Sequence, residues 1–204
     1  KKNPIRPLIE DLSKLPFVDY SIFDYAKTRE VTELSSLMVQ ASRGCFFQCT
    51  YCGNNYLMHL YPNKKKYLRS VSVDWLIGEI KYGLSLFPFL RAIRFIDDTL
   101  TNNKEWFKEF VTKYKKEIAL PFSGNDRVEN LTKETVFMLK DAGCSCLDIG
   151  IENGDEAFRK AYMHRYMSNK TIVDAFYYLR QAVIKTSAFN IFGMVGETKQ
   201  ITLQ

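Results

Sequence analysis

Three closely spaced cysteines are the most chemically distinctive feature of this sequence. Cys45, Cys49 and Cys52 follow the spacing C-x-x-x-C-x-x-C. Structural zinc binds four protein ligands, and the only histidines in the chain are His59 and His164. Three thiolates on one short loop can instead hold three irons of a [4Fe-4S] cube, which leaves the fourth iron open to a small molecule. A zinc-binding or redox-active cysteine group is the alternative interpretation.

The cysteine stretch resembles that of the radical S-adenosylmethionine (SAM) enzymes. These enzymes share the spacing and usually carry an aromatic residue before the last cysteine, which is the position of Tyr51 here. The resemblance implies that Cys45, Cys49 and Cys52 ligate a [4Fe-4S] cluster whose open iron chelates SAM, with Tyr51 in the cofactor site. It also implies reductive cleavage of SAM to methionine and a 5′-deoxyadenosyl radical. The electron would come from an external donor of the flavodoxin or ferredoxin type.

Composition narrows the class of protein. A chain of 204 residues with 46% hydrophobic residues can bury one sizeable core. The chain contains no run of eighteen uncharged apolar residues, so the sequence predicts no membrane span. The five cysteines, an odd number in two clusters, suit a reducing cytoplasm. The net charge of +6 is spread over helical stretches, which favours a solvated basic surface and leaves nucleic-acid binding open.

Short apolar strands alternate with amphipathic helices from residue 37 onward. Polar capping residues precede four of the helices, namely Ser72 or Asp74, Asn102 or Asn103, Thr132, and Ser168. This alternation predicts an α/β fold with a parallel sheet. The resemblance covers residues 37–204 and indicates a partial (β/α)6 barrel that is truncated after about the fifth strand. The expected strands are residues 37–42, 91–96, 119–125, 144–151 and 187–193.

Polar residues follow the carboxyl ends of the second and third strands, where barrel active sites lie. Asp97 and Asp98 are adjacent, so their side chains should point in opposite directions. The resemblance places this pair where the family binds the amino group of SAM, and capping of the next helix is the alternative. Asn125, with Ser123 and Arg127, suits a ribose or a carboxylate, although such residues are also ordinary in loops.

A glutamate, Glu152, lies just beyond the fourth predicted strand. The stretch from Gly150 to Gly154 resembles the Gly-Ile-Glu-Ser-Gly stretch of cobalamin-type radical SAM proteins, with Asn153 in place of the serine. A buried carboxylate needs a partner, and Arg165 follows on the next loop. We therefore expect Glu152 and Arg165 to contact SAM. A purely structural ion pair between them is the alternative.

A second cysteine pair lies at the beginning of the same strand. Cys144 and Cys146 are two residues apart, so a regular strand would turn both side chains to one face. No further ligand residues nearby complete a metal site. We expect both to be small buried hydrophobic residues.

The first 36 residues differ from the rest in their prolines. Pro4, Pro7 and Pro16 interrupt any long helix. The segment resembles the connector that joins an N-terminal cobalamin domain to the barrel in cobalamin-binding radical SAM proteins. We therefore expect residues 1–36 to be an interdomain arm and residues 37–204 to be an incomplete barrel. An arm that packs on this domain alone is the alternative.

The function predicted from these features is that of a radical SAM enzyme core. Its outcome would be cobalamin-linked methyl transfer or related C–H functionalisation of an unknown substrate, most simply a small molecule. Cobalamin would bind through a domain that this chain does not contain. Two alternatives remain: a basic nucleic-acid-binding module with a metal-bound cysteine knuckle, and a radical SAM enzyme that modifies tRNA.

Overall fold

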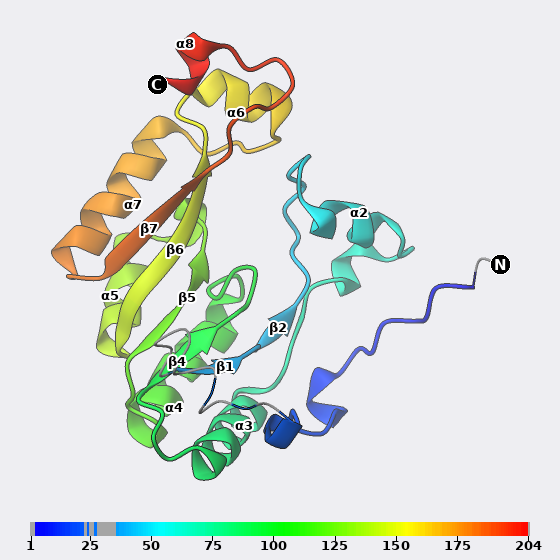
Figure 1. Cartoon of the computed structure of the whole chain (residues 1–204), viewed down its shortest axis with the longest axis vertical. Helices are drawn as coiled ribbons and strands as arrows, with labels where there is room; N and C mark the ends of the chain where they lie inside the picture. The colour runs from blue at the N-terminus through cyan, green and yellow to red at the C-terminus, as the bar shows by residue number, and fades with distance from the viewer. Residues whose placement is uncertain (1–2, 23, 25–26, 28–35, 204) are drawn as a thin grey trace.

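A five-stranded parallel sheet forms the centre of the computed structural model, which describes residues 3–22, 24, 27 and 36–203. The strand order β1-β4-β5-β6-β7 follows the chain, and the sheet curves as a partial barrel wall (Figure 1). This confirms the predicted α/β fold. The last strand begins and ends earlier than expected because its polar first residues pair with β6. The strands are β1 (Ser36–Val39), β4 (Ala92–Phe95), β5 (Phe122–Asp126), β6 (Cys144–Glu152) and β7 (Lys185–Asn190).

Four helices cover one face of this sheet (Figure 1). Each begins after a Ser, Thr or Asn side chain that accepts a hydrogen bond from the backbone N–H three residues further on. The predicted caps are confirmed, with Ser72 chosen over Asp74 and Asn103 over Asn102. The helices are α3 (Val73–Leu86), α4 (Lys104–Glu117), α5 (Lys133–Asp141) and α7 (Asn169–Gln181). In the described residues, no helix has the length and apolar character needed to cross a membrane.

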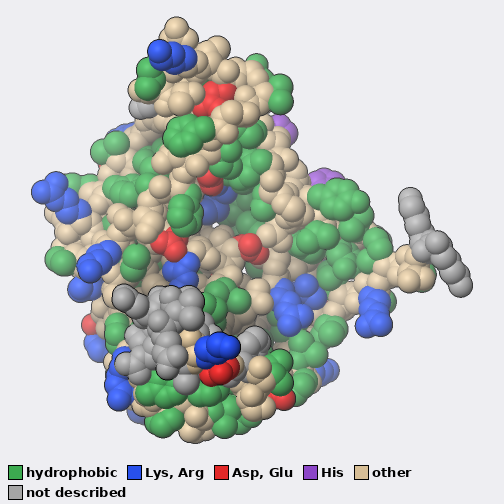
Figure 2. All heavy atoms as spheres, viewed as in Figure 1, with side chains coloured by type: hydrophobic (Ala, Val, Ile, Leu, Met, Phe, Trp, Pro, Cys, Tyr) green, Lys and Arg blue, Asp and Glu red, His purple; other side chains and the backbone are tan. Residues whose placement is uncertain are grey.

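The two faces of the sheet differ in polarity. Toward the helices the strands present buried apolar side chains, and Phe95 and Phe122 meet edge to face with ring centroids 5.5 Å apart. The opposite face carries polar residues because successive strand side chains alternate between faces. Figure 2 shows acidic and basic side chains around a hollow in the middle of the molecule. The polar residues of this concave face are Arg94, Ser123, Asn125, Cys146 and Asp148.

Several short elements around the cysteine stretch were not predicted, since each is too short to show a period in the sequence. A small antiparallel pair precedes and follows the cysteines, and a two-turn helix begins directly after Cys52. Together these elements frame the loop that carries the cysteines (Figure 1). They are β2 (Ser42–Arg43), α2 (Gly53–His59), η3 (Lys64–Lys66) and β3 (Arg69–Ser70). Elsewhere the chain forms η1 (Leu12–Lys14), η2 (Tyr20–Ile22), η4 (Val128–Asn130), α6 (Glu156–Tyr162) and α8 (Lys199–Thr202).

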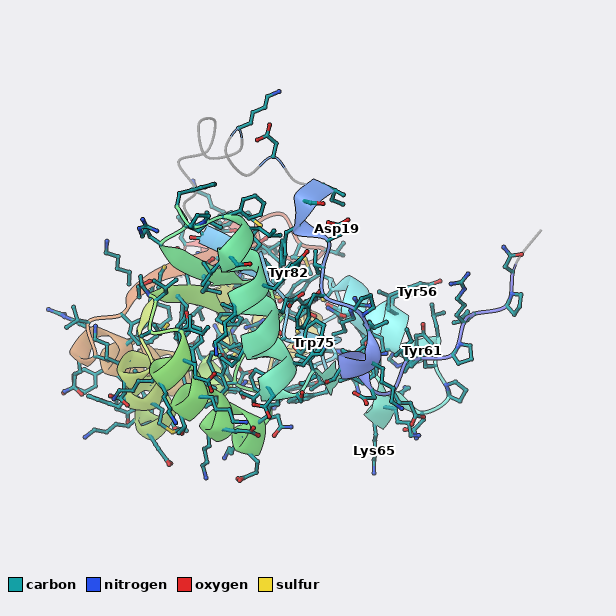
Figure 3. The ribbon with its side chains drawn as sticks, turned by 90° about the horizontal axis from the view of Figure 1, so that it is seen from below. Asp19, Tyr56, Tyr61, Lys65, Trp75 and Tyr82 are labelled. Atoms are coloured by element: carbon teal, nitrogen blue, oxygen red, sulfur yellow. The ribbon has the colours of Figure 1, made fainter. Side chains whose placement is uncertain are left out.

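Residues 12–20 of the N-terminal arm pack along α3, whereas the first residues of the arm run out from the body of the molecule (Figure 3). The ring of Phe17 lies between Trp75 and Tyr82, with centroid distances of 5.1 and 5.9 Å. The indole N–H of Trp75 donates to the carbonyl of Leu15 at 3.1 Å. Residues 28–35, which belong to the predicted arm, lie outside the described residues. Residues 12–20 of the arm are therefore fastened to the barrel domain itself.

A β-bulge separates the two cysteines of β6. Phe122 pairs with Cys144 and the next residue, Ser123, pairs with Cys146, so Ser145 is an extra residue in β6. Cys144 consequently lies on the helix-covered face, 2% exposed, whereas Cys146 lies half-buried on the concave face. The expectation that both cysteines face one side is wrong, because one inserted residue reverses the alternation of side chains.

The last strand, β7, is exposed along its whole length. It pairs with β6 on one side, and within the described residues its other side pairs with no strand. Phe189 and Phe192 are 53% and 68% exposed. Within the described residues, the sheet therefore ends at a mostly polar strand with one unpaired edge, from which Phe189 is exposed.

Candidate cluster and cofactor site

The three cysteines of the loop open into one cavity. Cys45 and Cys49 are buried, Cys52 is half-buried and precedes α2, and all three are free thiols. Burial raises the pKa of the Cys45 thiol, and the backbone N–H of Phe47 opposes that rise. The cavity holds about 320 Å³ at the carboxyl ends of the central strands. Its other lining residues are Phe47, Tyr51, Asn54, Asp98, Thr99, Asn125, Asp126, Arg127, Asp148, Gly150, Glu152, Arg165 and Phe189.

Backbone contacts on both sides fix the path of the cysteine loop. Gly44 has φ of +93°, and a Cβ there would lie 2.6 Å from the carbonyl oxygen of Tyr67, so only glycine fits. At the other end, the backbone N–H of Thr50 donates to the Met163 carbonyl at 3.2 Å. The Thr50 hydroxyl donates to the Tyr162 carbonyl at 2.7 Å. The loop is thus held between Tyr67, which follows η3, and the end of α6.

The arrangement of the thiols fits an iron–sulfur cube. In the part of the chain that the structure describes, no three His, Cys, Asp or Glu side chains converge on a point where one ion could bind. Ligands of one zinc ion must converge, since Zn–S bonds are about 2.3 Å long. Each cysteine of a cube binds a different iron, so the three sulfurs surround a volume instead of a point. Three free thiols around one cavity meet that requirement.

The structure brings Tyr51, Glu152 and Arg165 together at the edge of the same cavity. Arg165 is 4% exposed, and its Nη1 lies 3.5 Å from Oε1 of Glu152. The same nitrogen donates to the Tyr51 hydroxyl at 3.2 Å, and Nη2 donates to the Gly150 carbonyl. Burial raises the pKa of the Tyr51 hydroxyl, so it stays protonated near neutral pH. The Glu152–Arg165 ion pair, which the sequence offered as the alternative to SAM contact, is present, and it links the cysteine loop to the end of β6.

An unusual backbone conformation aims Glu152 at the cavity. Glu152 has φ of +72°, a left-handed conformation that costs a non-glycine residue roughly 1–2 kcal/mol. The pairing with β7 shifts register here, since Gly150 pairs with Phe189 and Glu152 with Asn190. A Cβ on Gly150 would lie 2.1 Å from Oε1 of Glu152. The missing side chain at position 150 therefore leaves the space that the carboxylate occupies.

The adjacent aspartates have different surroundings, as their alternation predicts. Asp98 is exposed and lines the cysteine cavity. Asp97 is fully buried, and its carboxylate accepts hydrogen bonds from the Ala41 N–H at 3.0 Å and the Ser42 hydroxyl at 2.5 Å. Burial raises the pKa of Asp97 to about 6. Neither aspartate caps α4, which Asn103 caps, so the capping alternative is wrong.

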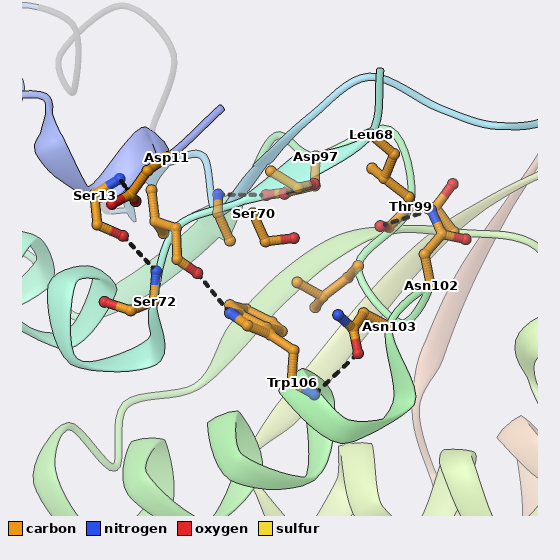
Figure 4. A pocket seen from close by; sticks show the side chains of 14 residues that line it. Asp11, Ser13, Leu68, Ser70, Ser72, Asp97, Thr99, Asn102, Asn103 and Trp106 are labelled. Atoms are coloured by element: carbon orange, nitrogen blue, oxygen red, sulfur yellow. Dashed lines mark hydrogen bonds between the residues drawn. The ribbon is translucent and has the colours of Figure 1, made fainter. Parts of the chain in front are cut away.

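Asp97 instead lines a second cavity of about 400 Å³ beside α4 (Figure 4). This cavity is bordered by Ser13 of the arm and by Trp106, whose indole N–H donates to the Val71 carbonyl at 2.7 Å. The carboxylate of Asp97 ties the end of β1 to the end of β4. Its contacts favour a structural role, and they leave Asp98 as the carboxylate that reaches the cysteines.

Asn125 lies in the cysteine cavity, but its amide is already engaged. Its Oδ1 accepts from Arg94 Nη2 at 2.8 Å, and its Nδ2 donates to the Asp97 carbonyl at 2.8 Å. Arg94 Nη2 also pairs with Asp148 Oδ2 at 2.6 Å. Sequence reasoning missed Arg94 and Asp148, because both are single polar residues inside apolar strands. Asp148 pairs with Asn125, whereas Arg94 pairs with Ser123 and reaches diagonally to both; this arrangement could be found only from the register.

Comparison with known proteins agrees with this geometry. The family model of the radical SAM superfamily matches residues 39–202. The chain belongs to the radical SAM superfamily. This assigns it to the radical SAM class of enzymes, as the cysteine spacing predicts.

Two curated proteins match this chain along most of its length. An uncharacterized methyltransferase of Pyrococcus horikoshii is 24% identical over 206 residues, which covers 98% of this chain and 42% of the relative. The anaerobic magnesium-protoporphyrin IX monomethyl ester cyclase of Synechocystis is 26% identical over 191 residues, with 92% and 35% covered. This radical SAM chain therefore spans less than half the length of these relatives.

Solved structures show the same fold. The radical SAM methyltransferase TsrM from Kitasatospora setae, determined with cobalamin and a [4Fe-4S] cluster bound, superposes with a TM-score of 0.67. The match has 15% sequence identity and covers 81% of this chain and 30% of TsrM. At this identity the likeness concerns the fold, and it confirms the partial radical SAM barrel.

Proposed function

We propose that this chain is the core of an enzyme that cleaves SAM reductively to a 5′-deoxyadenosyl radical. The carrying observation is that Cys45, Cys49 and Cys52, on one loop, open into a single cavity at the carboxyl ends of the strands. When bound there, a [4Fe-4S] cluster would supply the electron that breaks the S–C5′ bond. The protein's share of the work is to hold the cofactors and exclude water from them.

Individual side chains of the cavity have complementary roles in this proposal. Asp98 is the exposed carboxylate beside the cysteines and would accept a hydrogen bond from the SAM ammonium group. Glu152 and Arg165 would bind the ribose and amino acid parts of SAM, and Tyr51 keeps Arg165 in place. Asn125 would position the floor of the site through Arg94 and the Asp97 carbonyl. Of the predicted cofactor contacts, Asp97 would have a structural role, and Tyr51 and Asn125 would act by positioning other groups.

The outcome after radical formation is proposed from the relatives. A methyltransferase and a cyclase are the curated relatives, and TsrM is a cobalamin-bound methyltransferase. We infer cobalamin-linked methyl transfer or related C–H functionalisation of a small molecule. Residues 1–36 would then form the arm toward a cobalamin-binding domain, and residues 37–204 the barrel. An external flavodoxin or ferredoxin would deliver the electron in the cytoplasm.

Anaerobic reconstitution tests the proposal directly. Protein treated with iron and sulfide should carry about four irons per chain, as one cube requires. After reduction it should show the electron paramagnetic resonance (EPR) signal of a reduced cube, and the signal should change on addition of SAM. Slow release of 5′-deoxyadenosine from SAM should accompany reduction. Bound zinc without iron would refute the proposal and favour the nucleic-acid-binding alternative.

A further inference from the structure

Arg127 directs a guanidinium N–H at one of the three loop cysteines. It follows β5 directly and is 7% exposed. Its Nη1 donates to Sγ of Cys49 at 3.2 Å, and the two residues are 78 positions apart in the chain. An N–H this close to sulfur is a charge-assisted hydrogen bond. The contact lies inside the cysteine cavity, which both residues line.

Two further contacts hold the guanidinium in this orientation, and a third holds the backbone of Arg127. Its Cζ lies 3.7 Å from the ring centroid of Phe47, which is itself part of the cysteine loop. Its Nη2 pairs with Oε1 of Glu129 at 2.5 Å. The backbone N–H of Arg127 donates to Oδ1 of Asp126 at 2.8 Å, which anchors the residue at the end of β5. The guanidinium is thus fixed by stacking and by an ion pair, and the backbone of Arg127 is fixed at the end of β5.

These contacts separate Arg127 from the other arginine of the cavity. Arg165 faces Glu152 and Tyr51, where we place SAM. Both terminal nitrogens of Arg127 are engaged with protein groups, and its Nε is buried without a hydrogen-bond partner. The guanidinium is therefore directed at Cys49. The sequence alone had suggested a different partner, the ribose or carboxylate of a bound small molecule.

We propose that Arg127 is a positioning residue that raises the reduction potential of a cluster bound through Cys49. This inference rests on the proposed function. Hydrogen bonds to the sulfurs and net local charge both set the potentials of iron–sulfur clusters. Reduction adds one electron from the external donor and makes the cluster more negative. A fixed cation with an N–H on a ligand sulfur stabilises that reduced state more than the oxidised one.

The test is a redox titration of reconstituted protein, followed by the EPR signal of the reduced cluster. At the wild-type midpoint potential, Arg127→Met should contain about tenfold less reduced cluster relative to oxidised cluster, a shift of about 59 mV for one electron. Arg180→Met, which removes an exposed charge on α7, is the matched control and should leave the midpoint unchanged. Iron content is measured in every sample, so that only loaded protein is compared.

Two more variants separate charge from hydrogen bonding. Arg127→Met combined with Glu129→Gln keeps the net charge of the pair and loses the N–H···S contact, so a smaller shift in the same direction should remain. Arg127→Lys keeps the positive charge but loses the planar, forked guanidinium. If Arg127→Met fails to load a cluster, the titration is carried out on Arg127→Lys. It should also lower the potential.

The outcomes distinguish this inference from the proposed function. A loaded Arg127→Met or Arg127→Lys protein with the wild-type midpoint would overturn the role of Arg127 and leave the proposed function intact. An equal shift in Arg180→Met would also overturn it, since long-range charge would then explain the effect. A wild-type protein that forms no cluster would overturn both.

Discussion

The two cysteine groups of this chain have the same chemistry but opposite surroundings. Cys45, Cys49 and Cys52 lie on an irregular loop that turns all three thiols into one cavity. Cys144 and Cys146 lie on a strand, where a single bulge sends one thiol to each face. Thiol number and sequence proximity therefore do not make a ligand set. What makes one is a backbone that turns between the residues and is held from outside, as Gly44 and Thr50 hold this loop.

The largest effect should come from removing a loop cysteine. Alanine at Cys45, Cys49 or Cys52 should abolish cluster assembly, because each thiol would bind a different iron. Alanine at Cys144 or Cys146 should leave the iron content unchanged and serves as the matched control. Iron and sulfide analysis after anaerobic reconstitution measures both. Iron retained in Cys49→Ala, or lost in Cys144→Ala, would contradict the division of the cysteines into these groups.

Alkylation of the unfolded and folded apoprotein should separate the two strand cysteines. Burial raises the pKa of the Cys144 thiol to about 12, so only about one part in ten thousand is thiolate near pH 8. Cys146 lies half-buried on the concave face, where its pKa is raised less strongly by burial. In folded protein Cys146 should therefore react with iodoacetamide at least about tenfold faster than Cys144.

Mass spectrometry of peptides at timed intervals gives the two rates, and unfolded protein supplies the reference in which both should react alike. Equal protection of both cysteines in the folded protein would mean that they share the buried face. That result would contradict the bulge at Ser145.

The polar contacts around the loop give an intermediate effect. Glu152→Gln and Arg165→Met should each weaken SAM binding about ten- to a hundredfold, since a lost hydrogen bond to a charged group costs roughly 1.5–3 kcal/mol. The cluster should still assemble, because neither residue is a ligand. Calorimetry on loaded protein measures the affinity, and Glu105→Gln, whose side chain is 87% exposed, is the control. Unchanged affinity in both variants would favour a purely structural ion pair.

The last prediction concerns stability, through Asp126, a buried carboxylate at the end of β5 that also lines the cysteine cavity. Burial raises its pKa to about 6 in the folded protein, against hydrogen bonds from the N–H groups of Arg127 and Thr101. A raised carboxyl pKa gives stability below about pH 4 that is lost as the pH rises through 6. Asp126→Asn should remove this loss, so between pH 4 and pH 7 the unfolding free energy of the variant should fall by about 2–3 kcal/mol less than that of the wild type.

Urea unfolding at a series of pH values measures this difference between variant and wild type. Comparing the pH dependence of the two proteins removes any pH-independent effect of the Asn amide on the unfolding free energy. An identical pH dependence in the two proteins would show that Asp126 ionises normally in the folded state.

The sequence by itself predicted the longer helices, the strands of the parallel sheet and the family. Helix caps such as Ser72, Thr132 and Ser168 are local signals, because a side chain and a backbone N–H three residues apart interact without help from the rest of the fold. The alternation of strands and helices is likewise a pattern along the chain, and it predicted a parallel sheet. The cysteine spacing also acts within one loop, and it sufficed to predict the family.

Only the tertiary structure decided how distant residues meet. Arg127 contacts Cys49 because β5 ends beside the cysteine loop, and no local pattern encodes that neighbour. The bulge at Ser145 depends on pairing between two strands, so the opposite faces of Cys144 and Cys146 were invisible in one strand's alternation. The structural role of Asp97 follows from its hydrogen bond with the N–H of Ala41, just after β1, which only the fold brings close. Local rules fix conformations along the chain, whereas strand register and packing fix which side chains share a cavity.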